Sequence, residues 1–301
     1  MLQGLISDIH RFSLEDGPGI RTTIFMKGCP LSCVWCHNPE THSTQPQLRF
    51  RQAQCQDCLE CVKVCPSGAH AHVEQHHFAA FDACDLNGAC VSACPNRALS
   101  IVGKYWSAPD IIQVILKDRS YYESSSGGVT LSGGEPLMQI HFIRELLEAI
   151  KGENIHTCLD TSGHAPTEHL DQIMDFVDLY YFDYKATGLE NHRKLTGVRN
   201  KVILENLEYL LRNEQQVILR CPLIPGINDD DKHLDAILSL AQKYPELKGV
   251  HVLPYHSFGR SKWRDLGMEV PISLPASTTE GDLSRWHKLL SHEINIPIQI
   301  I

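Results

Sequence analysis

Short apolar segments alternate along the chain with longer amphipathic segments. The short segments are rich in β-branched and aromatic residues, and most of them stop at a Gly, Pro, Ser or Asp, as buried strands do. The pattern predicts one strand within residues 1–8. It predicts further strands at residues 22–27, 128–131, 156–160, 179–185, 217–222, 249–253 and 296–301.

The segments between these strands carry apolar residues at helical spacing. Ser107, Pro109 and Asp110 are typical of a helix start, because a hydroxyl caps free amides and proline fits the first turn. The apolar stripes that indicate helices are Ile111, Val114, Ile115 and Leu116; Ile140, Ile143, Leu146, Leu147 and Ile150; and Leu283, Trp286, Leu289 and Leu290.

This alternation predicts an α/β fold with a parallel sheet and right-handed crossovers, either doubly wound or barrel-like. Roughly six or seven strand–helix units favour a full or partial (β/α) barrel, with reactive groups at the carboxyl ends of the strands. Residues 50–103 interrupt this alternation of strands and helices, because they are rich in Cys, His, Gly and Pro and lack a long helical stripe. We therefore predict a core of residues 1–49 and 104–301 and an inserted module of residues 50–103.

Composition excludes several classes of function. The 301 residues are 43% apolar and 21% charged, and 36 acidic residues outnumber 27 basic ones to give a net charge of -9. Without a Lys/Arg stripe to neutralise phosphates, we expect no nucleic-acid partner. The N-terminus lacks the pattern of a signal peptide, and no apolar run approaches the ~20 residues of a membrane helix. The sequence therefore predicts a cytoplasmic protein without a membrane partner.

Ten of the twelve cysteines lie between Cys29 and Cys94 at short spacings, which indicates metal binding rather than a disulfide framework. Cys29, Cys33 and Cys36 follow a predicted strand on one loop. Three thiolates can hold three irons of a [4Fe–4S] cluster and leave the fourth iron open for a substrate. The alternative is a zinc site completed by His37 or a distant residue, which a three-residue gap beside a two-residue gap suits poorly.

The inserted segment contains a second cysteine pattern. Cys55, Cys58, Cys61 and Cys65-Pro66 form the bacterial ferredoxin run, and Cys84, Cys90 and Cys94-Pro95 form a second run. In two-cluster ferredoxins the last cysteine of each run serves the other cluster. The first cluster would take Cys55, Cys58, Cys61 and Cys94, and the second would take Cys65, Cys84 and Cys90.

Asn87 occupies the place of the fourth ligand of this second cluster. The second cluster could contain three irons, take water or Asp85 as a ligand, or be absent. A module stapled by zinc is the weaker alternative, because a complete ferredoxin run binds an iron–sulfur cluster in nearly all cases. Cys158 and Cys221 lie in strand-like segments and are expected to be buried apolar residues.

The cysteine loop carries Trp35 before its last cysteine, and two further motifs flank it: Asp16-Gly17-Pro18-Gly19-Ile20-Arg21 and Cys36-His37-Asn38-Pro39-Glu40. Together they resemble the glycyl-radical-enzyme activating enzymes of the radical SAM superfamily, which include the pyruvate formate-lyase activating type. The resemblance extends over residues 9–267, apart from the insert. It implies an anaerobic oxidoreductase that cleaves S-adenosylmethionine reductively and removes hydrogen from a backbone glycine of a partner glycyl radical enzyme.

The resemblance also implies roles for individual residues. Cys29, Cys33 and Cys36 would hold the catalytic cluster, and an electron donor such as flavodoxin or ferredoxin would reduce it. The 16–21 loop is where we expect contact with the partner's glycine, although its glycines could simply form a tight turn. The residues expected around S-adenosylmethionine are Trp35, Cys36, His37, Gly133, Gly134, Glu135, Asp160, Asp183, Tyr184, Lys185 and His256.

Each of these assignments has a structural alternative. Gly133 and Gly134 could form an ordinary turn, Asp160 and Lys185 could belong to ion pairs, and His256 is one of 17 histidines, distinguished by its place after a strand and before residues 259–263. Two other functions remain open: a radical SAM reaction on a different peptide or small molecule, and an electron-transfer protein whose clusters only relay electrons. The insert would pass electrons to the catalytic cluster or support docking.

Overall fold

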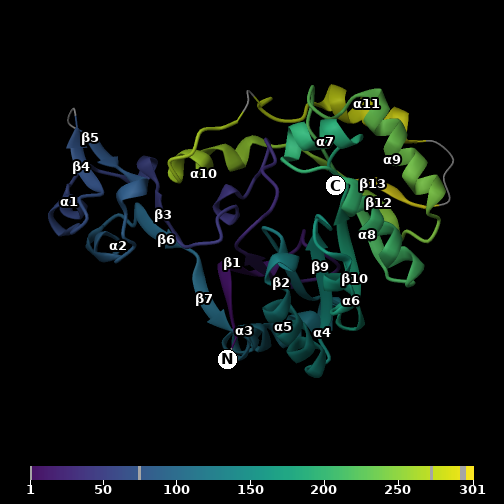
Figure 1. Cartoon of the computed structure of the whole chain (residues 1–301), viewed down its shortest axis with the longest axis horizontal. Coiled ribbons are helices and arrows are strands. Elements are labelled where there is room, and N and C mark those ends of the chain that lie inside the picture. The colour runs from purple at the N-terminus through teal and green to yellow at the C-terminus, as the bar shows by residue number, and fades with distance from the viewer. Residues whose placement is uncertain (1, 74–75, 272–273, 292–295) are drawn as a thin grey trace.

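The computed structural model of the chain describes residues 2–73, 76–271, 274–291 and 296–301 (Figure 1). Its main sheet has nine strands in the order β13-β12-β11-β10-β9-β8-β2-β1-β7. They are β1 (Gln3–Ser13), β2 (Arg21–Met26), β7 (Lys104–Ser107), β8 (Gly128–Gly133), β9 (His156–Thr161), β10 (Leu179–Asp183), β11 (Val217–Leu223), β12 (Gly249–Pro254) and β13 (Ile298–Ile300).

All pairs from β2 to β13 are parallel, whereas β1 is antiparallel to both β2 and β7. The edge strands β7 and β13 do not pair with each other in the described part of the chain, so the sheet is an open, partial barrel. This confirms the predicted fold class. Each predicted strand occurs within a few residues of its expected bounds; β1 extends to Ser13, and Met1 lies outside the described residues.

Helices connect the parallel strands; most lie around the right-hand and lower parts of Figure 1, whereas α10 lies toward its upper left. They are α3 (Ala108–Ile115), α4 (Arg119–Ser125), α5 (Ile140–Gly152), α6 (Thr167–Asp171), α7 (Leu189–Thr196), α8 (Lys201–Arg212), α9 (Asp231–Lys243), α10 (Arg260–Asp265) and α11 (Glu280–Leu290). Ser107 caps α3 as predicted, accepting from the amide of Asp110. The predicted stripe of α5 is buried against the sheet, which explains why this helix forms where it does.

The cysteine-rich segment forms two small sheets and two short helices, on the left of Figure 1. β3 (Gln47–Phe50) pairs with β6 (Leu99–Val102), and β4 (His70–Val73) pairs with β5 (His76–Ala79). The helices α1 (Glu60–Val64) and α2 (Ala89–Ala93) pack between them. The pair β3–β6 starts at Gln47, ahead of residue 50 where the composition begins to change.

Several contacts join this segment to the barrel, among them a hydrogen bond from Lys27 Nζ, after β2, to Gln47 Oε1 of β3 at 2.8 Å. Arg49 of β3 lies 3.4 Å from the carboxylate of Asp265 in α10. Gly267 follows α10 and adopts a φ of +69°, and a Cβ there would stand 2.2 Å from the ring of Phe81. The close approach of the Phe81 ring therefore requires glycine at this position. Because α10 also contacts the cysteine loop, the segment is anchored near the carboxyl ends of the barrel strands.

Asn206 of α8 holds the loop that follows β9. Its buried amide donates to the carbonyls of Gly163 and Ala165, both at 2.8 Å, and its Oδ1 accepts from the Thr167 hydroxyl at 2.7 Å. Buried carbonyls need partners, because an unpaired one costs about 1–3 kcal/mol. The side chain of a helix on the outer layer thus fixes a loop at the carboxyl edge of the sheet.

Replacement of Asn206 by alanine is expected to lower the free energy of unfolding by about 2–4 kcal/mol, because the Ala165 carbonyl loses its donor, the Thr167 hydroxyl loses its acceptor and the Gly163 carbonyl keeps only the Ala165 amide. Urea titrations followed by circular dichroism under anaerobic conditions would measure the change. The matched control is Glu205→Ala, next in the same helix, whose exposed pair with Lys201 spans 3.7 Å and should contribute less than about 0.5 kcal/mol. Equal losses in the two variants would contradict this role of Asn206.

Candidate active site

The loop after β2 is held in place by backbone hydrogen bonds. The amides of Ser32 and Val34 donate to the carbonyls of Thr196 and Leu195 at the end of α7, at 2.8 and 3.0 Å. The amide of Cys36 donates to the carbonyl of Cys33 at 3.0 Å, which closes a turn within the loop. Leu31 and Trp35 are buried in a small apolar cluster beneath it, together with Cys33. These contacts hold the three cysteines of the loop on one side of the barrel.

All three cysteines of this loop line one enclosed cavity of about 80 Å³. Burial raises the pKa of each thiol, and that of Cys36 reaches about 12. Such thiols keep their protons unless a cation displaces them, as a metal does on binding. Three buried thiols around one cavity thus form a donor set that fits an iron–sulfur cluster.

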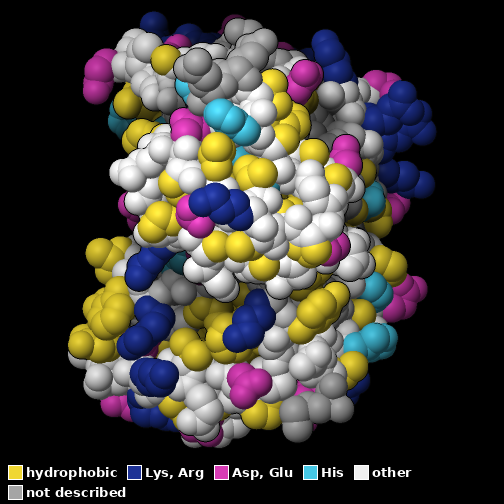
Figure 2. Space-filling model, turned by 90° about the vertical axis from the view of Figure 1, so that its left-hand side faces the viewer, with side chains coloured by type: hydrophobic (Ala, Val, Ile, Leu, Met, Phe, Trp, Pro, Cys, Tyr) yellow, Lys and Arg dark blue, Asp and Glu magenta, His cyan; other side chains and the backbone are white. Residues whose placement is uncertain are grey.

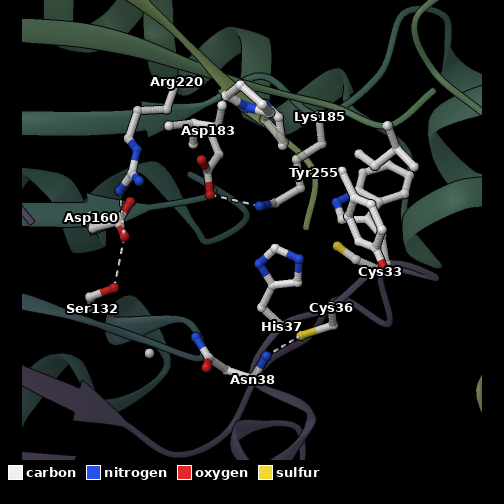
Figure 3. A pocket seen from close by; sticks show the side chains of 16 residues that line it. Cys33, Cys36, His37, Asn38, Ser132, Asp160, Asp183, Lys185, Arg220 and Tyr255 are labelled. Atoms are coloured by element: carbon white, nitrogen blue, oxygen red, sulfur yellow. Dashed lines mark hydrogen bonds and ion pairs between the residues drawn. The ribbon is translucent and has the colours of Figure 1, made fainter. Parts of the chain in front are cut away.

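A larger cavity of about 220 Å³ adjoins the first (Figure 3). Figure 3 shows the cysteine loop on one side of it and side chains from the strand ends on the other. The residues that line both cavities are Cys33, Cys36, Ser132, Gly133, Asp160, Asp183 and Lys185. A ligand in the larger cavity would therefore lie directly against a group bound to the cysteines.

Two ion pairs cross the floor of the larger cavity. Arg220 Nη1 lies 3.1 Å from Asp160 Oδ2, which also accepts from the Ser132 hydroxyl at 2.7 Å. Lys185 Nζ lies 2.7 Å from Asp183 Oδ2. Two acids and two bases, all largely buried, give a site of alternating charge. Such a site suits a ligand that carries both an ammonium group and a carboxylate.

The ion pairs influence the protonation states of the acidic and basic side chains that line this cavity. Burial raises the pKa of Asp160, although the charge of Arg220 opposes that shift. Burial by itself would lower the pKa of Lys185, but the carboxylate of Asp183 outweighs it and the pKa is raised. Lys185 therefore stays protonated and available to an anionic group.

Three buried polar atoms around this cavity have no partner among the described residues: Asp160 Oδ1, Arg220 Nε and His37 Nε2. An unsatisfied buried polar group is unusual in a folded protein and calls for an explanation. Here all three residues line the same cavity, so a polar ligand would satisfy them. The cavity has the chemistry of a binding site for a small charged molecule.

Gly133 and Gly134 lie at the end of β8 and pack closely against β2 and the start of the cysteine loop. Gly133 has a φ of +102°, and a Cβ there would stand 2.5 Å from the backbone of Met26. A Cβ on Gly134 would stand 2.2 Å from the carbonyl oxygen of Gly28. The neighbouring strand β2 and the start of the cysteine loop therefore require these glycines. Both also line the cavity around the cysteines.

Glu135 is fully buried beside these glycines and faces the protein rather than the larger cavity. Its carboxylate accepts from Thr161 Oγ1 at 2.6 Å, from the Ser162 amide at 2.9 Å and from the Leu137 amide at 3.1 Å. Burial raises its pKa, while these hydrogen bonds lower it in part. Glu135 thus ties the loop after β8 to the loop after β9.

The remaining predicted residues take different positions. Trp35 and His37 line the larger cavity, and the ring of His37 stacks on that of His256 at 4.1 Å. His256 is exposed at the rim. Burial, then the charge of His256, lowers the pKa of His37 to about 4. Tyr184 lines neither cavity: its ring is buried in the core and its hydroxyl contacts Thr187 at 2.8 Å.

Several residues at this site were not predicted from the sequence. Arg220 is the clearest, because a charged residue in the otherwise apolar strand β11 was a signal that could have been followed. Trp263 donates from its indole to the Cys36 carbonyl at 3.0 Å. Lys262 donates to Asn38 Oδ1 and to Glu40 Oε1, each at 2.7 Å. These contacts join segments more than 200 residues apart, and no local pattern indicates them.

In the inserted segment, Cys55, Cys58, Cys61 and Cys94 line a single cavity. His77 also lines it, with Nε2 at 3.5 Å from the Cys61 sulfur, and His70 Nδ1 lies 2.9 Å from the same nitrogen. No local pattern distinguishes this histidine from the other sixteen.

Comparisons with known proteins agree with this geometry. A model of the radical SAM superfamily matches residues 92–237, and models of a 4Fe-4S single cluster domain and a 4Fe-4S dicluster domain match residues 15–71 and 47–96. A solved radical SAM methyltransferase from Sphaerobacter thermophilus shares the fold with a TM-score of 0.52 and 14% identity, over 98% of this chain and 76% of that one.

Curated relatives are similar over nearly the whole chain. The choline trimethylamine-lyase activating enzyme of Oleidesulfovibrio alaskensis is 39% identical over 99% of this chain and 98% of its own length. The 4-hydroxyphenylacetate decarboxylase activating enzyme of Clostridioides difficile is 37% identical over 94% of this chain and 91% of its own. With these relatives, and with its cysteine loop opening onto a charged cavity, the chain belongs to the glycyl-radical-enzyme activating enzymes of the radical SAM superfamily.

Proposed function

We propose that this chain activates a partner glycyl radical enzyme, using a [4Fe–4S] cluster on Cys29, Cys33 and Cys36 together with S-adenosylmethionine. The observation that carries the proposal is the pair of adjoining cavities, one lined by three buried thiols and the other by two acid–base pairs. With both groups bound, one electron divides S-adenosylmethionine into methionine and a 5′-deoxyadenosyl radical, which takes hydrogen from the partner's glycine.

The protein's part is to hold the reactants and exclude solvent. Lys185 would meet the carboxylate of S-adenosylmethionine, and the free Oδ1 of Asp160 would accept from one of its N–H or O–H groups. The backbone at Gly133 would lie beside the amino end. Glu135 acts indirectly, by fixing the two loops on which these groups stand. The stacked rings of His37 and His256 would face the nucleoside end at the rim.

The 16–21 loop is the proposed contact for the partner's glycine. Asp16 Oδ2 accepts from Thr23 Oγ1 at 2.7 Å, and its carbonyl accepts from Thr130 Oγ1 at 2.7 Å. The buried guanidinium of Arg21 donates to the Pro18 carbonyl at 3.1 Å. The charge of Asp16 also contributes to the raised pKa of Arg220, a residue that lines the larger cavity. The relatives named above support a partner enzyme as the substrate.

We also propose that electrons enter through the insert, which would hold at least one complete cluster on Cys55, Cys58, Cys61 and Cys94. Helix α10 touches both ends of this route, because Trp263 bonds to the Cys36 carbonyl and Asp265 pairs with Arg49. Figure 2 looks onto the side that carries the insert, and its Lys and Arg side chains gather in the lower half of the view, below the height of the insert in Figure 1. The electron donor would be a protein such as a flavodoxin or ferredoxin, docking on the side of the molecule that carries the insert.

The central test is product formation. Anaerobic, reduced protein mixed with S-adenosylmethionine is expected to give 5′-deoxyadenosine by liquid chromatography, and a glycyl radical doublet in the EPR spectrum once a partner enzyme is added. Cys33→Ala should reduce both to background, because one of three iron ligands is lost. Cys158→Ala, a buried cysteine of β9 away from the loop, should keep both. If 5′-deoxyadenosine forms but no glycyl radical enzyme that is added acquires a radical, the result would favour a different substrate for this radical SAM protein.

Lys185→Met is expected to weaken binding of S-adenosylmethionine about 10- to 100-fold, the effect of losing a charged hydrogen bond of about 1.5–3 kcal/mol. Equilibrium dialysis under anaerobic conditions would give the dissociation constant, and iron per chain should stay at the wild-type level. The control is Lys201→Met on α8, an exposed lysine that should leave binding unchanged. Unchanged binding in Lys185→Met would show that the lysine serves only its ion pair with Asp183.

Cys61→Ala tests the route of the electron. We expect 5′-deoxyadenosine formation driven by reduced flavodoxin to fall close to the rate without a donor, while formation driven by titanium(III) citrate continues, because the small reductant reaches the catalytic cluster directly. Lys63→Ala, an exposed residue on the same helix, is the control. An equal loss with both reductants would count against an electron relay and favour a structural or docking role for the insert.

A further inference from the structure

The two halves of the insert repeat the same backbone conformation around their cysteine runs. In the first half, Asp57 and Leu59 have left-handed φ values of +51° and +61° on either side of Cys58. In the second half, Leu86 and Gly88 have φ values of +58° and +77° on either side of Asn87. A short helix follows in each half, α1 after the first and α2 after the second. Asn87 therefore stands at the backbone position that Cys58 holds in the other half.

The side chain of Asn87 is occupied by its own loop. Its Oδ1 accepts from the amide of Ala89 at the start of α2, at 2.9 Å. Its Nδ2 donates to Asp85 Oδ1. The same oxygen also accepts from the backbone amide of Asn87 at 3.3 Å. Asn87 and Asp85 thus satisfy each other and the helix start. The amide of Asn87 is therefore engaged by its own loop, and one oxygen of Asp85 is engaged with it.

The three cysteines of the second set lie near one another. Cys90 is buried, and Cys65 and Cys84 are partly exposed. Cys65 follows α1 and Cys90 lies in α2, two helices that pack against each other, and Cys84 packs against the same apolar cluster as Cys90. Asn87 is exposed, as Cys58 is in the first half. The ligand position that lacks a thiolate therefore lies on the solvent side of the second set of cysteines.

We propose that the second cluster of the insert is held by Cys65, Cys84 and Cys90 alone, and that its fourth iron faces solvent and takes water or a small thiolate as its ligand. This inference rests on the proposed role of the insert cysteines as cluster ligands. It gives the protein a second open iron outside the catalytic site. It also makes the two halves of the insert chemically different, although their backbones match.

An iron without a protein ligand is lost more readily on oxidation than one held by a thiolate. With ferricyanide as a one-electron oxidant, [4Fe–4S]²⁺ would give [3Fe–4S]⁺ and Fe²⁺, and the released electron would reduce ferricyanide to ferrocyanide. The first cluster, with four thiolates, would keep its four irons. The expected sign is a three-iron EPR signal that comes from the insert.

The catalytic cluster also has only three thiolates, so the experiment uses the full chain with Cys29, Cys33 and Cys36 changed to alanine. Reconstituted under anaerobic conditions, this protein should hold about eight irons, and one equivalent of ferricyanide should lower the count to about seven with a three-iron EPR signal. Adding Asn87→Cys should keep about eight irons and abolish the signal. Asn87→Ala should behave like the asparagine protein, because the amide is not a ligand.

Other outcomes would overturn the proposal. Retention of all eight irons by the asparagine protein would mean that a protein group holds the fourth iron, and a count near four before oxidation would mean that the second cluster is absent. If the triple variant does not fold, the wild-type cysteine loop serves instead: Asn87→Cys should halve the three-iron signal, and no change would contradict the proposal. Activity is not measured here, so failure leaves the proposed function untouched.

Discussion

The parallel register of β2, β8, β9, β10 and β11 is the constraint on which the site depends. Parallel strands bring their carboxyl ends to one edge of a sheet, so the loop that follows each strand opens into the same space. The cysteine loop follows β2, the two glycines end β8, and the charged residues come from β9, β10 and β11. Residues far apart in the chain thereby line two adjoining cavities. No single loop carries enough chemistry to bind both a cluster and a charged ligand.

Close backbone packing at this edge fixes the site before any ligand is bound. Gly133 and Gly134 allow the end of β8 to lie against β2 and the start of the cysteine loop. Glu135 then joins that loop to the next through buried hydrogen bonds with Thr161 and Ser162. The cost of burying this carboxylate is offset by its several donors. The motif therefore has a structural role, on which the groups proposed to contact the ligand depend.

The two halves of the insert have matching backbones but differ at one ligand position, where Asn87 stands in place of a cysteine. The left-handed residues that flank Cys58 and Asn87 give both loops the same shape, so backbone geometry does not distinguish them. The difference lies in the side chain, since a thiolate binds iron and a neutral amide bonds to its own loop instead. The insert is anchored through α10, which also holds the Cys36 carbonyl. The module and the catalytic loop are thus joined by one short helix.

The sequence by itself determined the strand and helix pattern, the partial barrel, the insert and the family, because these depend on local periodicity and on closely spaced cysteines. It did not indicate Arg220, His77 or Trp263, nor that Tyr184 lies away from both cavities. Those positions depend on contacts between residues far apart in the chain, which only the packing of the sheet and of α10 brings together. The tertiary structure also decided what the glycines are for: their lack of a Cβ is needed against the backbone of β2, a neighbour that no local pattern identifies.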